Sequence, residues 1–366
     1  MTELHLGSAS APVWNPEFDD RLICLAVQPE THDITTFVFR APEGRRFAFE
    51  PGQFLTFAFE IGSETVNRCY TLASSPLRPY TASITVKRVP GGVVSGWLHD
   101  HMKPGLSVQA LGPMGAFSAA RHPAPKYLFL SGGSGITPVM SMSRAFADTA
   151  SPVDVVFLHA ARTPRDLVFR AELDLMARRL PGFRLLYLPE RADGEPGWAG
   201  PLGRLSHEML SIMVPDLLER TVFCCGPAPF MASARQICTE IGLPEASWHQ
   251  ESFDFSEMQE TQSAAADQLA AKEGEADPAR TFKVTFTRLR REIDVKADRF
   301  VLSAAREAGV RLPMSCTAGL CGTCKSKLVS GRVEMTHQGG IRQREIDIGM
   351  FLPCCSKPLS DLVIDR

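Results

Sequence analysis

Four cysteines near the carboxyl end constrain this chain more than any other feature. Cys316, Cys321 and Cys324 fall within nine residues, and Cys354 follows after a gap of 29 residues. Two glycines lie between the first three, so this segment can form a tight loop whose backbone amides point at sulfur. The C-x4-C-x2-C…C spacing is the one that holds a [2Fe-2S] cluster.

A structural zinc site is the alternative for the same thiols. Such sites usually pair two C-x2-C-like knuckles, whereas the distal half here supplies the adjacent residues Cys354 and Cys355, and neighbouring cysteines rarely bind one ion together. The spacing therefore favours the iron–sulfur cluster. The flanking segments predict a hairpin, a helix and a final strand, at residues 282–297, 301–309 and 361–365.

Charge divides the chain into parts. With 366 residues, of which 44% are hydrophobic, it is long enough for two or three domains with full cores. Residues 254–280 carry seven acids and two basic residues, which predicts a solvated acidic linker. Residues 281–366 carry 15 Lys/Arg against nine Asp/Glu, a net +6, and form a small basic α+β domain.

The sequence pattern before the acidic linker changes near residue 121. After an amino-terminal extension (1–17), residues 18–120 contain short alternating runs separated by Pro/Gly turns, which predict an antiparallel β-barrel. In residues 121–253, apolar strands alternate with helical stretches near 138–147, 170–179 and 228–241, and this rhythm predicts an α/β, doubly wound parallel sheet.

Composition excludes several classes of protein. The net charge of -2 predicts neither nucleic acid nor an anionic membrane as a partner. No stretch is long and apolar enough to span a bilayer, and the amino terminus lacks the order of a secretory signal. We therefore expect a cytoplasmic protein, in which the ten cysteines act as metal ligands, redox groups or buried apolar residues.

A second motif lies in the barrel, at Arg68-Cys69-Tyr70-Thr71. An Arg supplies a permanent forked cation for a phosphate, Tyr offers an aromatic face to a flat ring, and Thr offers a hydroxyl to a ring nitrogen. On its own, the tetrapeptide also fits an ordinary strand with one buried Tyr. A small-residue run at the start of a predicted helix favours a pyrophosphate site, through Gly91, Gly92, Val93, Val94 and Ser95.

A third motif follows the apolar strand at 126–131. Gly133, Gly135, Thr137 and Pro138 belong to a glycine loop that opens a helix, the arrangement that seats a pyrophosphate. Pro138 replaces the last glycine of a plain G-x-G-x-x-G fingerprint and is tolerated at the start of a helix. A tight turn without a ligand is the alternative.

These motifs resemble those of known families. The cysteine segment, with Leu352 and Pro358 around the last ligand, is similar to a plant-type ferredoxin domain of the β-grasp fold, which implies Cys354 rather than Cys355 as the fourth ligand. The second and third motifs resemble the ferredoxin-NADP reductase superfamily. That resemblance implies a flavin on residues 68–71, its pyrophosphate on 91–95, FAD rather than FMN, and a nicotinamide cofactor on the glycine loop.

The resemblance also implies residues around the nicotinamide ring. Cys225, Gly226 and Pro227 match the Cys-Gly-Pro motif, whose Cys lies beside the nicotinamide, and Phe253 matches an aromatic residue that shields the flavin. A core Phe is the alternative for that residue. We expect four residues to act in catalysis: Tyr70, Thr71, Cys225 and Phe253.

The segment after the second parallel strand does not decide between the two nicotinamide cofactors. Arg162 or Arg165 could pair with a 2′-phosphate, while Asp166 could repel one and bind a ribose hydroxyl instead. The acid favours NADH, with NADPH as the alternative.

Electron counting links the three modules. A nicotinamide gives two electrons as hydride and a [2Fe-2S] centre takes one at a time, so a flavin must hold the difference. The whole resembles reductase components of Rieske-type oxygenases, and the runs at 83–100, 131–142 and 223–231 are similar to those of reductases that serve glycine betaine N-demethylation. This implies an oxygenase subunit as the electron acceptor, with an acidic docking face for the basic domain.

Two other readings stay open. The first is an NADH reductase for the hybrid-cluster protein or another acceptor, since that reductase has the same module order. The second is a zinc-stabilised interaction module fused to a degenerate Rossmann-like domain, which would carry neither flavin nor iron.

Overall fold

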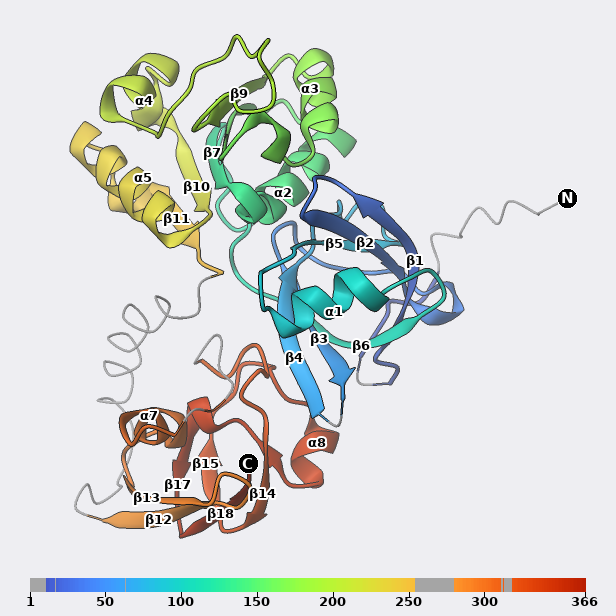
Figure 1. The fold of residues 1–366 in the computed structure, drawn as a ribbon, viewed down its shortest axis with the longest axis vertical. Helices are drawn as coiled ribbons and strands as arrows, with labels where there is room; N and C mark the ends of the chain where they lie inside the picture. The colour runs from blue at the N-terminus through green and yellow to red at the C-terminus, as the bar shows by residue number, and fades with distance from the viewer. Residues whose placement is uncertain (1–10, 17, 63, 254–279, 311, 313–317) are drawn as a thin grey trace, which may run out of the picture. The chain divides into compact units, whose positions relative to one another are not determined.

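A computed structural model gives the fold and describes residues 11–16, 18–62, 64–253, 280–310, 312 and 318–366 (Figure 1). The described residues belong to two compact units. One comprises those of Met1–Thr65 and Tyr70–Phe253, and the other those of Val66–Cys69 and Asp254–Arg366. Most of the predicted amino-terminal extension, nearly all of the acidic linker and the first cluster cysteine, Cys316, lie outside the described residues.

The amino-terminal part is an antiparallel barrel, as predicted. Its sheet has the strand order β4-β3-β6-β1-β2-β5. A bridge between Leu72 and Ile84, next to a 2.8 Å hydrogen bond from the Ala73 amide to the Ser83 carbonyl, joins the two edge strands and closes the barrel. The strands are β1 (Arg21–Pro29), β2 (Ile34–Arg40), β3 (Phe54–Ile61), β4 (Glu64–Thr71), β5 (Ala82–Lys87) and β6 (Ser107–Met114).

Alternation along the strands builds the barrel core. In β2, Phe37 and Phe39 are buried, and in β3, Leu55, Phe57 and Phe59 are buried. Aromatic and β-branched side chains suit this pleated surface. Helix α1 (Val93–His101) follows β5 and presents Val94, Ser95 and Leu98 to the interior.

The next part is a doubly wound parallel sheet, also as predicted. Its strand order is β11-β10-β7-β8-β9, and every pair is parallel. The strands are β7 (Lys126–Gly132), β8 (Asp154–Ala161), β9 (Phe183–Pro189), β10 (Thr221–Cys225) and β11 (Trp248–Glu251), and the helices are α2 (Ile136–Asp148), α3 (Arg170–Arg179), α4 (His207–Met213) and α5 (Ala228–Ile241).

The order of the strands locates a binding edge. From β7 the chain winds outward through β8 and β9, then returns to place β10 on the other side of β7. Helices α2 and α3 pack into the core on one face, and α4 and α5 into the core on the other (Figure 1). The strand order therefore reverses between β7 and β10, and ligands of such sheets bind at the carboxyl ends of the strands at this point.

The carboxyl-terminal part is a β-grasp domain. Its sheet has the order β13-β12-β18-β14-β16, with β12 and β18 parallel, and α7 packs into its core. The elements are β12 (Thr281–Phe286), β13 (Arg291–Lys296), α7 (Val301–Glu307), β14 (Ser326–Ser330), β15 (Val333–Met335), α8 (Gln343–Asp347), β16 (Met350–Phe351), β17 (Ser356–Pro358) and β18 (Leu362–Asp365).

Some elements carry no sequence signal. Helix α4 has seven residues and β11 only four, of which all but Trp248 are polar. Strand β6 continues through Gly112 and Pro113, because Met114 still pairs with Phe54 of β3. Among the described residues, no helix has the length and apolar character needed to cross a membrane.

Candidate functional site

The predicted flavin-ring residues lie at the end of β4. Thr71 is 5% exposed, and Tyr70 is half-buried. The Tyr70 ring centroid lies 6.1 Å from that of Phe57 and 6.5 Å from that of Phe59, so two neighbouring aromatic rings hold the Tyr70 ring in place. Tyr70 thus belongs to the strand and also offers an aromatic ring that its neighbours hold in place.

The predicted phosphate residue precedes them on the same strand. Side chains alternate along a strand, so Arg68 shares a face with Tyr70 while Cys69 shares the other with Thr71. The Arg68 Nη1 donates to the Asn67 carbonyl at 2.8 Å, and among the described residues no carboxylate forms an ion pair with it. Its charge therefore suits a phosphate.

The predicted pyrophosphate run begins α1. Gly91 has φ +71°, Gly92 is the residue before the helix, and the first amides of the helix belong to Val93, Val94 and Ser95. Such amides have no partner within a helix and favour an anion. The Ser95 hydroxyl donates to the Gly92 carbonyl at 3.4 Å, which fixes this turn.

The glycine loop and the Cys-Gly-Pro turn meet where the strand order reverses. A Cβ on Gly135 would lie 2.4 Å from the Cys225 carbonyl oxygen, so only glycine fits there. Gly133 has φ +53°, a conformation that favours glycine, and Thr137 and Pro138 are buried in the first turn of α2. Two motifs that lie far apart in the sequence thus touch at this edge.

Further contacts tighten the same junction. A Cβ on Gly226 would lie 3.0 Å from the Gly132 amide nitrogen, and a Cβ on Gly132 would lie 3.0 Å from the Pro227 Cδ. The turn after β10 therefore packs closely against the loop after β7, with the Phe230 ring beside both glycines. This leaves backbone amides at the amino end of α2 for a pyrophosphate.

Cys225 and Glu251 lie side by side on β10 and β11. The two residues are partners in the parallel register, and Cys225 is fully buried. Burial, and then the charge of Glu251, raise the pKa of the Cys225 thiol well above its usual value, so the thiol stays neutral. Phe253 is half-buried and packs against the core that contains Cys225.

Glu251 is the site residue that sequence reasoning missed. Its Oε2 is buried and has no hydrogen-bond partner among the described residues, and burial raises the pKa of the carboxyl to about 8. A buried carboxyl beside the predicted nicotinamide residue is typical of a functional site. Only its place at the carboxyl end of the last strand could have drawn attention to it.

Asp166 has a local structural role besides the predicted ribose contact. Its Oδ2 accepts hydrogen bonds from the Thr163 amide at 3.0 Å and the Thr163 hydroxyl at 2.8 Å, and its Oδ1 lies 3.5 Å from the His32 Nδ1. Arg162 is exposed directly after β8. Both residues lie at the carboxyl end of the sheet, but their roles toward a ribose stay predictions.

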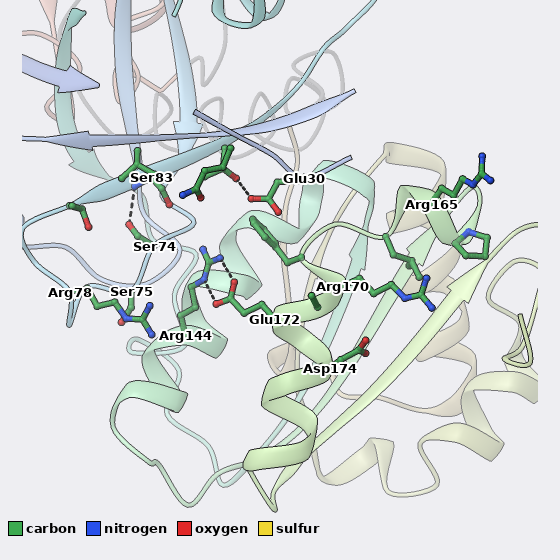
Figure 2. Close-up of a pocket in the computed structure, with 18 of the residues that line it drawn as sticks. Glu30, Ser74, Ser75, Arg78, Ser83, Arg144, Arg165, Arg170, Glu172 and Asp174 are labelled. Carbon is green, nitrogen blue, oxygen red and sulfur yellow. Dashed lines mark hydrogen bonds and ion pairs between the residues drawn. The ribbon is translucent and has the colours of Figure 1, made fainter. Parts of the chain in front are cut away.

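A cavity of about 1050 Å³ lies between the barrel and α3 (Figure 2). Among the described residues predicted to bind flavin or nicotinamide, Arg165 alone lines it. Its charged side chains are largely paired with one another, including Arg144 with Glu172 at 2.6 Å and Arg170 with Glu195 at 2.9 Å. The cavity therefore lies apart from the edge where the predicted motifs meet.

The cluster loop brings the described cysteines together. Cys321, Cys324 and Cys354 are buried, and the hydrogen bond between Cys324 and Cys354, followed by burial, raises the pKa of Cys324. The Thr323 amide lies 3.5 Å from the Cys321 Sγ, and Gly319 supplies a backbone hydrogen bond to Cys354. Soft thiolates with amides directed at sulfur suit an iron–sulfur cluster.

Cys355 packs differently from Cys354. It is buried in the domain core, its Sγ lies 3.6 Å from the Leu352 carbonyl, and a Cβ on Gly319 would lie 2.7 Å from the same Sγ. This is the environment of a packed thiol, although the choice of Cys354 as ligand stays a prediction. Cys316, the first predicted ligand, lies outside the described residues.

Comparison with family models identifies the three parts. Residues 25–119 match the oxidoreductase FAD-binding domain, residues 129–236 the oxidoreductase NAD-binding domain, and residues 284–359 the 2Fe-2S iron–sulfur cluster binding domain. These matches confirm the predicted fold class and the cofactors FAD, a nicotinamide and [2Fe-2S]. The alternatives of a zinc module and a degenerate Rossmann-like domain are wrong.

Full-length relatives and a solved structure agree with these matches. The chain is 45% identical over 345 residues (93% of this chain, 94% of the relative) to a glycine betaine monooxygenase reductase subunit of Pseudomonas aeruginosa, and 44% identical over 370 residues (100% of both) to that of Chromohalobacter salexigens. The solved phthalate dioxygenase reductase has 26% identity and a TM-score of 0.56, with 96% of this chain and 100% of that chain covered. The chain therefore belongs to the family of electron-transfer oxidoreductases that join an FAD-binding barrel, an NAD-binding domain and a carboxyl-terminal 2Fe-2S ferredoxin domain, a family that includes the glycine betaine monooxygenase reductase subunits.

Proposed function

We propose that this reductase takes hydride from NADH and delivers single electrons to a Rieske-type oxygenase that N-demethylates glycine betaine. The single observation that carries the proposal is the 44% identity to a glycine betaine monooxygenase reductase subunit along the full length of both chains. Relatives that serve oxygenases favour an oxygenase over the hybrid-cluster protein as acceptor.

The chain's own residues divide the work. Arg68 and the amides of residues 93–95 bind the flavin phosphates, while Tyr70 and Thr71 orient the flavin ring. The amides at the start of α2 bind the nicotinamide pyrophosphate. Cys225 and Phe253 form part of the wall of the space for the nicotinamide ring. Bound flavin supplies the exchange between hydride and single electrons.

Cysteine thiolates hold the redox centre that faces the acceptor. Cys316, Cys321, Cys324 and Cys354 are the proposed ligands, and Gly319 and Gly322, with φ +70° and +72°, let the loop curl so that amides reach sulfur. Amides that donate to sulfur stabilise added negative charge and tune the reduction potential.

NADH is the proposed donor, because Asp166 places a negative charge where a 2′-phosphate would lie. Its carboxylate is held by Thr163 and near His32, so it is fixed rather than free to turn away. NADPH would meet Arg162 but also this charge. Comparing the two cofactors at equal concentration tests the preference.

The acceptor's docking face is proposed to be acidic. The carboxyl-terminal segment has a net +6, and complementary charge raises the association rate of electron-transfer partners. Electron delivery should slow as ionic strength rises. The proposed location is the cytoplasm, in keeping with the free thiols of the described cysteines.

Reconstitution with a purified oxygenase tests the function. With NADH, oxygen and glycine betaine, the holoprotein and the oxygenase subunit of a glycine betaine monooxygenase should release formaldehyde. The Cys321→Ser variant should not support this reaction, yet should still reduce a flavin-level dye. Equal or faster electron delivery to a hybrid-cluster protein would contradict the proposed acceptor.

A further inference from the structure

Helix α2 carries, at one end, the glycine loop that seats the nicotinamide cofactor. Two polar side chains further along this helix, Ser141 and Arg144, reach across to the barrel. The Ser141 hydroxyl donates to the Ser74 carbonyl at 2.7 Å, and the Arg144 Nη1 donates to the Ala73 carbonyl at 2.6 Å. Both acceptors follow closely after Thr71, the predicted flavin-ring residue.

Arg144 is held firmly by other contacts. Its Nε and Nη2 donate to the two carboxylate oxygens of Glu172 at 2.9 Å and 2.6 Å, and its side chain is 12% exposed. Figure 2 shows the guanidinium of Arg144 facing the carboxylate of Glu172 at the start of α3. A planar guanidinium that makes a bidentate pair has little freedom to move.

The same guanidinium lies over an aromatic ring with unusual backbone geometry. The Arg144 Cζ is 4.6 Å from the centroid of the Phe169 ring, and Phe169, directly before α3, has φ +56°. A bulky residue in the left-handed region is strained and persists only where surrounding contacts hold it. The stacked Arg144 is one of those contacts.

We propose that Arg144 is a positioning residue for hydride transfer: with Ser141 and Glu172 it fixes α2 against the Ala73–Ser74 backbone, and so sets how the nicotinamide ring approaches the flavin. This inference rests on the proposed hydride transfer from NADH to flavin. Small displacements of reacting groups matter greatly, because a misplacement of about 1 Å can slow a reaction by about 100-fold.

A second arginine provides a matched control. Arg78 also joins the barrel to α2, through a bidentate pair at 2.7 Å and 3.0 Å with Asp148, the last residue of the helix, but the Arg78 side chain is 60% exposed. Exposed ion pairs contribute little to positioning or stability. Arg78→Met and Arg144→Met therefore remove the same chemical group from two different environments.

Stopped-flow reduction of the anaerobic holoprotein by NADH tests the proposal. Arg144→Met should lower the rate constant of flavin reduction about 10- to 100-fold, with the Kd for NADH changed less than about threefold and cluster reduction by dithionite unchanged. Arg144→Lys should recover part of the rate, because it keeps the charge but loses the fork. Arg78→Met should behave as the unmodified protein.

Hydrogen–deuterium exchange gives a readout that does not depend on activity. The peptide containing Ala73 and Ser74 should exchange faster in Arg144→Met but not in Arg78→Met. If Arg144→Met does not fold, Arg144→Lys and Glu172→Gln provide the same comparison. An unchanged flavin reduction rate in all three, or an equal loss in Arg78→Met, would overturn the positioning role. Failure of the unmodified protein to be reduced by NADH would instead overturn the proposed function.

Discussion

Glu251 predicts how the stability of the folded protein depends on pH. Its carboxyl lies beside Cys225, one of its oxygens is buried without a hydrogen-bond partner in the part of the chain that the structure describes, and burial raises its pKa to about 8. The folded protein therefore keeps a proton on Glu251 at pH values where the unfolded chain has released it. Between these two pKa values the folded state binds more protons, so its stability falls as pH rises.

The magnitude follows from this difference in protonation. The stability contributed by the neutral carboxyl is complete below the unfolded pKa and is lost as pH rises through the folded pKa near 8. Each pH unit well between the two pKa values is worth about 1.4 kcal/mol, and half of the carboxyl groups are already ionised at a pH equal to the folded pKa of about 8, so a rise from about pH 6 to pH 8 should cost about 2 kcal/mol. For a unit of this size that corresponds to a fall in Tm of about 4–8 °C.

Glu251→Gln tests this prediction by removing the ionisable group while keeping the shape. Thermal unfolding of the first unit, followed between pH 6 and pH 9, should show a smaller loss of Tm in the variant than in the unmodified protein. Glu240→Gln, an exposed position on α5, is the control and should keep the original slope. Parallel pH profiles for the unmodified protein and Glu251→Gln would refute the reasoning.

Four further variants test the cluster ligands, the flavin site and the glycine loop. Cys354→Ser should abolish cluster incorporation, measured by iron content and electron paramagnetic resonance, whereas Cys355→Ser should keep the cluster; the opposite pattern would exchange their roles. Thr71→Ala should slow flavin reduction by NADH about tenfold or more with the cluster intact, and an unchanged rate would remove Thr71 from the site. Gly135→Ala should destabilise the protein by about 1–3 kcal/mol, because its Cβ would overlap the Cys225 carbonyl; an unchanged Tm would contradict the close contact.

Much of the fold could be predicted because the signals are local. Strand alternation indicated the barrel, the alternation of apolar strands with helices indicated the parallel sheet, and the ranges of α3 (Arg170–Arg179) and α5 (Ala228–Ile241) agree with the predicted 170–179 and 228–241. The short elements α4 and β11 escaped prediction, since seven and four residues carry too few turns or alternations to show a period. Tertiary pairing, rather than local pattern, places them.

The candidate site likewise combines features that a local sequence pattern predicts with features that depend on tertiary structure. Glycine loops and cysteine spacing are read directly from the chain, because the backbone they require permits few alternatives. The contact between Gly135 and Cys225 depends on strand order, which no local pattern encodes. Glu251 and Arg144 depend on burial and on partners far away in the sequence, so the sequence alone did not single them out.

An anaerobic titration of the purified protein with NADH tests the central claim most directly. The account predicts one FAD and one two-iron cluster per chain, with flavin absorbance bleached by NADH and the signal of a reduced [2Fe-2S] cluster appearing in the same samples. Flavin that is reduced while the cluster stays oxidised, or a preparation without iron, would contradict the conversion of hydride to single electrons within this chain.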